Sequence, residues 1–291
     1  MNYTEHAQIF NCGDSRLLGI ATQPASPAET GVLIVVGGPQ YRSGSHRQFT
    51  LLARYLAEQG YASLRFDYRG MGDSEGETRN FEGINEDLRA AIDSWQTQAS
   101  WVKRVVIWGL CDAASAALYY AHSDSRVSAL VLLNPWVHSE AGAARARLKH
   151  YYLTRLMQRS FWLKLLSGKV ELRKSAGDLS TAAQRAATAS STAASAPADP
   201  RHGSPGYVGC MLKGLQQFQG EVLILLSGND LVAQEFITLT QQDKQWKQCC
   251  ASPKITRETI REANHTFSSQ RWREQVAERT VRWLSRQMEQ L

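Results

Sequence analysis

The sequence predicts an α/β fold, with a mostly parallel twisted sheet and helices on both of its faces. Three observations support this: short apolar runs alternate with longer amphipathic stretches, the runs are rich in β-branched residues, and turn residues separate them. The chain has 291 residues, of which 43% are apolar and 21% are charged. This length is sufficient to bury one large core and suits a single α/β domain that carries an insertion.

Each apolar run is expected to form one strand. The parallel strands are expected near residues 31–36, 61–66, 104–108, 129–133, 222–227 and 255–260. Two earlier runs, near 6–10 and 15–21, are expected to form an antiparallel hairpin at the sheet edge, with its turn at 11–14. The amphipathic stretches predict helices near 47–59, 80–98, 113–122 and 270–288.

The interval between the fourth and fifth parallel strands is too long for a simple connection. We therefore divide the chain into a core of residues 1–134 and 221–291 and an inserted helical cap of residues 135–220. Within the cap, residues 175–198 are almost wholly Ala, Ser and Thr, and this composition predicts a mobile loop.

The formal net charge of +6 is unevenly spread along the chain. Residues 145–174 hold nine Lys or Arg and one acidic residue, Glu171, and their apolar residues recur as on one face of a helix. A solvated helix face explains this pattern, and we favour it over a basic cap that attracts an anionic substrate, an acidic glycan or a membrane surface. No recognised binding motif accompanies the basic residues, which argues against a nucleic-acid partner.

Five cysteines form an odd set without the paired spacing of metal ligands, namely Cys12, Cys111, Cys210, Cys249 and Cys250. This pattern argues against a disulfide framework and against a zinc site, and it favours a reducing compartment. The first ten residues lack the basic start and the apolar stretch of a secretion signal, and the apolar runs are too short to span a bilayer. We therefore expect a soluble intracellular protein that requires neither a metal nor an organic cofactor.

The most informative stretch runs from Trp108 to Ser115, where a β-branched strand ends in a turn of small residues around one cysteine. This pattern is typical of a nucleophile elbow, with Cys111 in place of the usual serine. The turn is so tight that the residues two positions before and after the nucleophile, Gly109 and Ala113, must be small. We therefore expect Cys111 at a helix N-terminus, where amide groups and the helix dipole favour the thiolate.

Two further segments supply an acid and a base at the same edge of the sheet. Asp230 follows the strand predicted at 222–227, and His265 follows the strand predicted at 255–260. A turn-forming aspartate and a surface histidine would explain either residue alone. The chain order of nucleophile, acid and histidine, however, favours a catalytic triad of Cys111, Asp230 and His265.

Consecutive glycines after the first parallel strand allow the backbone to approach a ligand closely, as an oxyanion loop requires. Because Pro39 has no N–H to donate, we expect the amide of Gln40 to hold the oxyanion together with the amide of Asp112. The candidate substrate contacts in or near this loop are Gly38, Tyr41 and His46.

A glycine-rich turn with charged residues, at positions 67–74, follows the second parallel strand. Its expected task is architectural, since a charged turn at the end of a strand is common. One arrangement open to this turn is an ion pair between Asp67 and Arg69 beneath the active-site loops.

These motifs resemble the α/β-hydrolase superfamily, and the resemblance covers almost the whole chain outside the predicted cap. A narrower resemblance, to the first type of exosortase A system-associated hydrolase, is carried by Gly37-Gly-Pro-Gln-Tyr-Arg42 with Gly44-Ser-His-Arg47, by Gly109-Leu-Cys-Asp112 and by Asn264-His-Thr-Phe-Ser268. It implies an α/β-hydrolase fold in a cytoplasmic bacterial protein linked to exopolysaccharide production and to the sorting of proteins with a C-terminal anchor signal. The chain departs from the superfamily pattern in its cysteine nucleophile and in Ala113, which replaces the usual glycine.

The sequence therefore predicts a hydrolase that cleaves an ester or thioester in a small or glycan-linked acyl substrate. His265 would take the proton of Cys111 or pair with its thiolate, while Asp230 would fix the imidazole tautomer. The carboxylate of Asp112 would oppose thiolate formation if it lay close to the sulfur. Two alternatives stay open: an acyltransferase that passes the acyl group to a sugar hydroxyl, and a binding or scaffold protein that docks through the basic cap.

Overall fold

A computed structural model of the chain describes residues 2–38, 40–137 and 206–288. Within these residues eight strands form one sheet in the order β1-β2-β4-β3-β5-β6-β7-β8. The strands are β1 (Tyr3–Cys12), β2 (Ser15–Pro24), β3 (Thr30–Val35), β4 (Ser63–Asp67), β5 (Arg104–Leu110), β6 (Val127–Leu133), β7 (Glu221–Ser227) and β8 (Ile255–Ile260). Only the pairs β1–β2 and β2–β4 are antiparallel among these strands, so the predicted mostly parallel sheet with an edge hairpin is confirmed.

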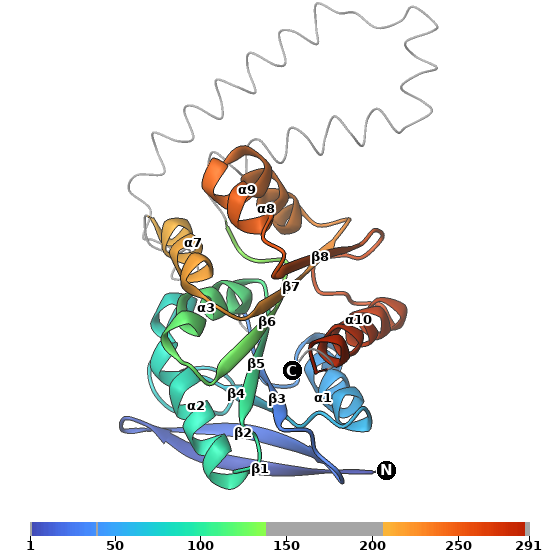
Figure 1. The fold of residues 1–291 in the computed structure, drawn as a ribbon. Helices are drawn as coiled ribbons and strands as arrows, with labels where there is room; N and C mark the ends of the chain where they lie inside the picture. Colours follow the sequence, from blue (N-terminus) through green and yellow to red (C-terminus); the bar gives the residue numbers. More distant parts are fainter. Residues whose placement is uncertain (1, 39, 138–205, 289–291) are drawn as a thin grey trace, which may run out of the picture. The chain divides into compact units, whose positions relative to one another are not determined.

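Helices cover both faces of this sheet, as the sequence predicts. They are α1 (Gln48–Glu58), α2 (Asn85–Gln98), α3 (Asp112–Tyr120), α7 (Tyr207–Gln217), α8 (Leu231–Gln242), α9 (Lys244–Cys250) and α10 (Gln270–Met288). Figure 1 shows α1 and α10 on one face of the sheet and α2, α3 and α7 on the other. The active-site loops follow the carboxyl ends of strands that these two layers hold in place.

Helices α8 and α9 are absent from the sequence-based prediction. They are short, and two of the four buried residues of α8 are threonines, which obscures the apolar period. Both helices begin after an aspartate whose side chain accepts hydrogen bonds from two amides of the first turn, Asp230 for α8 and Asp243 for α9. These two N-capping aspartates were the sequence signal from which the starts of α8 and α9 could have been predicted.

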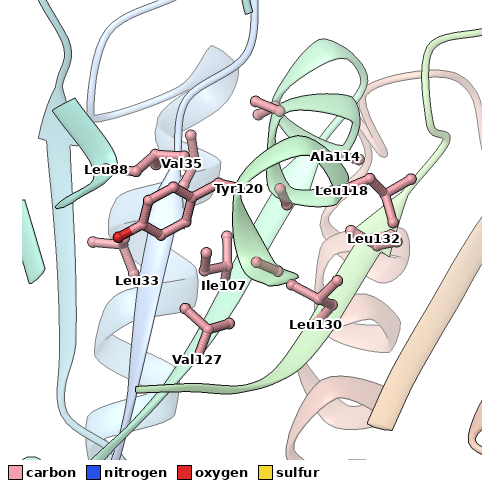
Figure 2. Packing of buried hydrophobic residues seen from close by; sticks show 14 of the residues in the cluster. Leu33, Val35, Leu88, Ile107, Ala114, Leu118, Tyr120, Val127, Leu130 and Leu132 are labelled. Atoms are coloured by element: carbon pink, nitrogen blue, oxygen red, sulfur yellow. The ribbon is translucent and has the colours of Figure 1, made fainter. Parts of the chain in front are cut away.

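Successive side chains of the central strands point into two separate apolar clusters. On β5, Ile107 packs beneath α2 and α3, whereas its neighbour Trp108 packs beneath α1 and α10. Figure 2 shows the first cluster, in which Ile107 lies with Leu33 and Leu130. Because both faces of the sheet are buried in this way, the strands appear in sequence as continuous apolar runs.

Part of the predicted cap folds with the core. Helix α7, which lies within the interval 135–220, packs against α3, and the Tyr119 hydroxyl donates a hydrogen bond to the carbonyl of Tyr207 (3.0 Å). Residues 138–205, which include the basic segment and the Ala/Ser/Thr-rich stretch, lie outside the described residues. Among the described helices none is long and apolar enough to cross a bilayer.

Candidate active site

Cys111 occupies a strained turn between β5 and α3. Its backbone has φ 63° and ψ −122°, a combination that a residue with a side chain adopts only when the surrounding structure enforces it. A Cβ on Gly109 would lie 2.7 Å from the carbonyl carbon and oxygen of Ala113, so this position requires glycine. The strand-to-helix turn thus has the geometry of a nucleophile elbow, and Cys111 caps the N-terminus of α3.

The backbone around Cys111 is fixed by neighbouring segments. Its amide donates to the carbonyl of Leu133 at the end of β6 (2.8 Å), and its carbonyl accepts from the amide of Trp136 (3.3 Å). The thiol is half-buried and packs against the apolar cluster beneath α1 and α10. Burial, followed by the nearby Asp112 carboxylate, raises the pKa of the Cys111 thiol far above its ordinary value, although the Asp112 amide partly offsets this.

His265 and Asp230 lie together at the ends of β8 and β7. Nδ1 of His265 and Oδ2 of Asp230 are 2.9 Å apart. The same aspartate accepts from the amides of Val232 (3.3 Å) and Ala233 (3.1 Å), so the start of α8 holds its carboxylate in place. This arrangement fixes which imidazole nitrogen faces the acid and leaves Nε2 for a reacting group.

Electrostatic effects connect this pair with the elbow. The Asp230 carboxylate contributes to the raised pKa of Cys111, and His265 acts in the opposite direction on the raised pKa of Asp112. Among the described residues, no hydrogen bond joins Cys111 Sγ to the His265 ring. The structure therefore joins the acid and the histidine by a hydrogen bond. The thiol is close enough to feel the charge of the acid, but it forms no hydrogen bond with the imidazole.

The Asp112 carboxyl group lies under the glycine loop after β3. Its Oδ2 accepts a hydrogen bond from the amide of Gly38 (2.9 Å), while its Oδ1 is buried and accepts none of good geometry from the described residues. A Cβ on Gly37 would lie 2.3 Å from that Oδ1 and 2.4 Å from the carbonyl oxygen of Leu110. Burial raises the pKa of the Asp112 carboxyl group, and its hydrogen bond from the Gly38 amide acts in the opposite direction.

The predicted site residues of the glycine loop differ in exposure and in hydrogen bonding. Gln40 uses its side-chain oxygen to accept from the amide of Ser45 (3.0 Å) and from the Gln48 side chain (3.4 Å), which holds the loop in a fixed shape. Tyr41 and His46 are exposed, and His46 has φ 54° in a short helical turn. The amide of Gly38 already donates its hydrogen bond to Asp112, so this amide of the loop is not available to an oxyanion.

A model of the family described as alpha/beta hydrolase fold matches residues 31–268, which covers most of the chain. The chain belongs to this family. Solved structures agree with the fold: an esterase of Pyrococcus furiosus superposes with a TM-score of 0.64 at 16% identity, covering 98% of this chain and 93% of the esterase. Est1E of Butyrivibrio proteoclasticus, solved with bound ferulic acid, superposes with a TM-score of 0.61 at 16% identity. The match covers 97% of this chain and 100% of Est1E.

Curated relatives match shorter stretches of this α/β-hydrolase chain. The quorum-quenching protein AidA of Acinetobacter baumannii is 27% identical over 136 residues, 44% of this chain and 42% of that protein. The polyketide transferase grgF of a Penicillium species is 29% identical over 102 residues, 32% of this chain and 33% of that protein. The matched stretches thus span less than half the length of these relatives.

Asn134 and Ser227 form a buried network under the histidine loop that sequence reasoning missed. The Asn134 amide nitrogen donates to the Ser227 hydroxyl (2.8 Å) and to the backbone carbonyl of His265 (3.0 Å), and the Ser227 hydroxyl donates to the carbonyl of Asn264 (2.8 Å). Both side chains are fully buried. The available signal in this α/β-hydrolase sequence was a polar residue where each of two apolar strands ends: Asn134 directly after β6 and Ser227 as the last residue of β7.

The ion pair considered between Asp67 and Arg69 does not form. Asp67 instead pairs with Arg42 of the glycine loop, whose amide also donates to it (2.6 Å), and Arg69 pairs with Asp87 of α2 (2.9 Å). Residues two apart share a face only while the strand continues, and Asp67 is the last residue of β4. Arg69 lies beyond it in the turn, so its side chain is free to reach α2. The pair Arg42–Asp67 ties the glycine loop to the turn after β4, which is the architectural task predicted for that turn.

Metal ligation was the other chemistry to consider for these side chains. Among those residues, no group of three or more His, Cys, Asp or Glu side chains is placed to hold a metal ion. All five cysteines are free thiols.

Proposed function

We propose that this α/β-hydrolase cleaves an ester or thioester through Cys111, His265 and Asp230, with a covalent acyl-thioenzyme intermediate. One observation carries the proposal: a cysteine in strained backbone geometry begins α3, while a histidine bonded to a fixed aspartate lies at the end of the neighbouring strands. Strain and a histidine–carboxylate pair at the carboxyl ends of parallel strands are characteristic of nucleophilic catalysis on this fold.

In the proposed reaction, Sγ of Cys111 attacks the acyl carbonyl carbon while Nε2 of His265 takes the thiol proton. The amide of Asp112 holds the oxyanion, a contribution of about 3 kcal/mol for one well-placed donor. We assign the second donor to the Gln40 amide and substrate contacts to Gly38, Tyr41 and His46. When the tetrahedral intermediate collapses, the bond to the leaving group breaks and the imidazolium returns the proton to that group.

Hydrolysis then completes the cycle. Water gives a proton to His265 and attacks the thioester carbonyl, and Cys111 leaves as the sulfur regains that proton. Because burial raises the pKa of Cys111, the resting nucleophile is a thiol, so His265 must remove its proton during attack. We propose that substrate binding closes the contact between thiol and imidazole, since catalytic hydrogen bonds are often long before the substrate binds.

The comparisons favour acyl chemistry, because the structural neighbour from Pyrococcus furiosus is named as an esterase. The substrate itself is a proposal drawn from the sequence motifs: an acyl group on a small molecule or glycan, in a cytoplasmic bacterial protein associated with an exosortase and exopolysaccharide system. The inserted cap would select this substrate. A weak contact with an anionic or membrane surface through the basic segment is part of the same proposal.

The deciding experiment is intact-mass analysis after incubation with an acyl thioester. The wild-type protein is expected to gain one acyl mass, Cys111→Ala none, and His265→Ala at least tenfold less at early times. Cys210→Ala is the matched control, because Cys210 is an exposed thiol outside the site and its loss should leave the adduct unchanged. Equal labelling of the wild type and Cys111→Ala would remove Cys111 as the nucleophile.

Acyl transfer is the second candidate, favoured by the relative that is named a polyketide transferase. The same acyl-thioenzyme would form, but a sugar hydroxyl would replace water in the second step. A product that forms only when an acceptor is supplied identifies the transferase. Release of the free acid at the same rate without acceptor identifies the hydrolase.

A further inference from the structure

A second cavity lies between α1 and α10, on the face of the sheet that carries the smaller apolar cluster. It encloses about 490 Å³, within the range of roughly 300–1,000 Å³ that is usual for small-molecule sites. Its floor is formed by buried apolar side chains from four elements and the histidine loop, namely Leu52, Trp108, Leu133, Phe267, Val276 and Ala277. Leu51, one of the few exposed large apolar residues, lies on its wall.

The charged side chains around this cavity sum to zero, with two arginines, Arg54 and Arg273, opposed by two glutamates, Glu58 and Glu274. Arg54 donates to Glu5 (2.7 Å), Glu274 accepts from Gln270 (2.7 Å), and Arg273 donates to a backbone carbonyl. The rim therefore has no excess of one charge that would attract a ligand of the opposite sign. A ligand that enters must gain its affinity from the apolar floor.

The cavity adjoins two parts of the candidate active site. Phe267 follows His265 by two residues and has φ 50°, so its position is coupled to the histidine loop. Gln48 lies on the opposite wall and contacts the Gln40 side chain of the glycine loop. Cys111 packs against the same apolar cluster that forms the floor. A ligand in the cavity would contact side chains that border the nucleophile, its histidine and its glycine loop.

We propose that this cavity binds an unbranched aliphatic chain. The floor is wholly apolar and the rim carries no net charge, so a hydrocarbon chain is the ligand that the lining fits. Its source is either the acyl chain of the substrate or a free amphiphile that acts on the histidine loop. That the aliphatic chain belongs to the substrate rests on the proposed function, whereas its binding in the cavity does not.

Binding is tested with dansyl-labelled undecanoic acid, which dodecanoate should displace. The wild type and Cys111→Ala are both expected to bind it in a saturable way, so a failure of catalysis does not hide the site. Ala277→Leu fills the floor and should weaken binding about tenfold or more. Leu51→Trp, at an exposed position, should narrow the site without endangering the fold. Arg286→Leu places the same leucine side chain at an exposed position of α10 outside the lining and should leave binding unchanged.

The source of the chain is tested with nitrophenyl esters of acetate and decanoate. If the chain belongs to the substrate, Ala277→Leu lowers kcat/KM for the decanoate ester and leaves that for the acetate ester unchanged. If it is an effector, dodecanoate changes the rate with the acetate ester in the wild type and not in Ala277→Leu. Absence of saturable probe binding, or equal weakening in Ala277→Leu and Arg286→Leu, overturns the proposal.

Discussion

The carboxyl groups of Asp112, the first residue of α3, and Asp124, which lies four residues beyond its last residue, have contrasting surroundings. Asp124 accepts from the Tyr120 hydroxyl, from the Arg126 guanidinium (2.7 and 2.8 Å) and from the Arg126 amide (3.1 Å). Asp112 accepts from one amide and keeps a buried oxygen without a well-placed donor. Although burial acts on both, Arg126 lowers the pKa of Asp124 to about 2, while burial raises that of Asp112.

The two aspartates therefore differ in their effect on the stability of the native state. At neutral pH the Asp124 charge favours the native state, whereas the charge of Asp112 disfavours it and opposes a thiolate at Cys111. Incompletely paired polar groups and strained backbone are concentrated at functional sites. The end of α3 that carries Cys111 has both of these features.

The largest effect is expected from Gly37→Ala. The new methyl group would lie 2.3 Å from Asp112 Oδ1 and 2.4 Å from the Leu110 carbonyl oxygen, so the glycine loop must shift. We expect a loss of about 3 kcal/mol in the free energy of unfolding, measured by urea titration. Gly209→Ala in α7 is the control, because nothing lies within 4 Å of its added Cβ. Normal stability in Gly37→Ala would mean that the Asp112 carboxyl group is not held under this loop.

Asp124→Asn tests the carboxyl group beyond the other end of α3. The shift from the ordinary pKa of 3.8 to about 2 corresponds to roughly 2 kcal/mol at pH 7. Because the pKa is lowered, this stability is present above pH 3.8 and is lost as the pH falls towards 2. Urea unfolding should therefore show a large difference between wild type and variant at pH 7 that narrows towards pH 2. Asp93→Asn, which removes the exposed partner of Arg126, should cost less.

The residues involved also show what sequence can predict. The central strands could be predicted because both of their faces are buried, and Asp230 could be located because it follows one of them, β7. His265 follows the edge strand β8, which is only partly buried and was predicted from its β-branched residues. By contrast, the bond between Gly38 and Asp112 joins residues 74 positions apart, and that between Arg42 and Asp67 joins residues 25 apart. Both depend on how closely two loops approach, which apolar periodicity does not encode. The network of Asn134 was missed for the same reason.

Asp112→Asn is expected to act mainly on the Cys111 thiol. The amide keeps an oxygen that can accept from Gly38 but removes the negative charge near Cys111, so the thiolate is stabilised. We expect the midpoint of the pH profile for alkylation of Cys111 by iodoacetamide to fall by about one pH unit, equivalent to tenfold faster reaction below both midpoints. Asp112→Ala also loses the bond to Gly38, so it separates the effect of charge from that of loop position. An unchanged midpoint in Asp112→Asn would show that the carboxylate does not govern the thiol.

The smallest effect is expected from Glu75→Gln, and it tests whether the direction of a pKa shift is sufficient to identify a stabilising group. Glu75 accepts from the guanidinium and the amide of Arg16, and these bonds lower its pKa as Arg126 does for Asp124. Both side chains are exposed, however, so water competes for the same interactions in the folded and unfolded chain. We expect no measurable change in Tm, since glutamine keeps an acceptor for the Arg16 amide. If Glu75→Gln lowered Tm as much as Asp124→Asn does, an ion pair would stabilise this fold whether or not its carboxylate is buried.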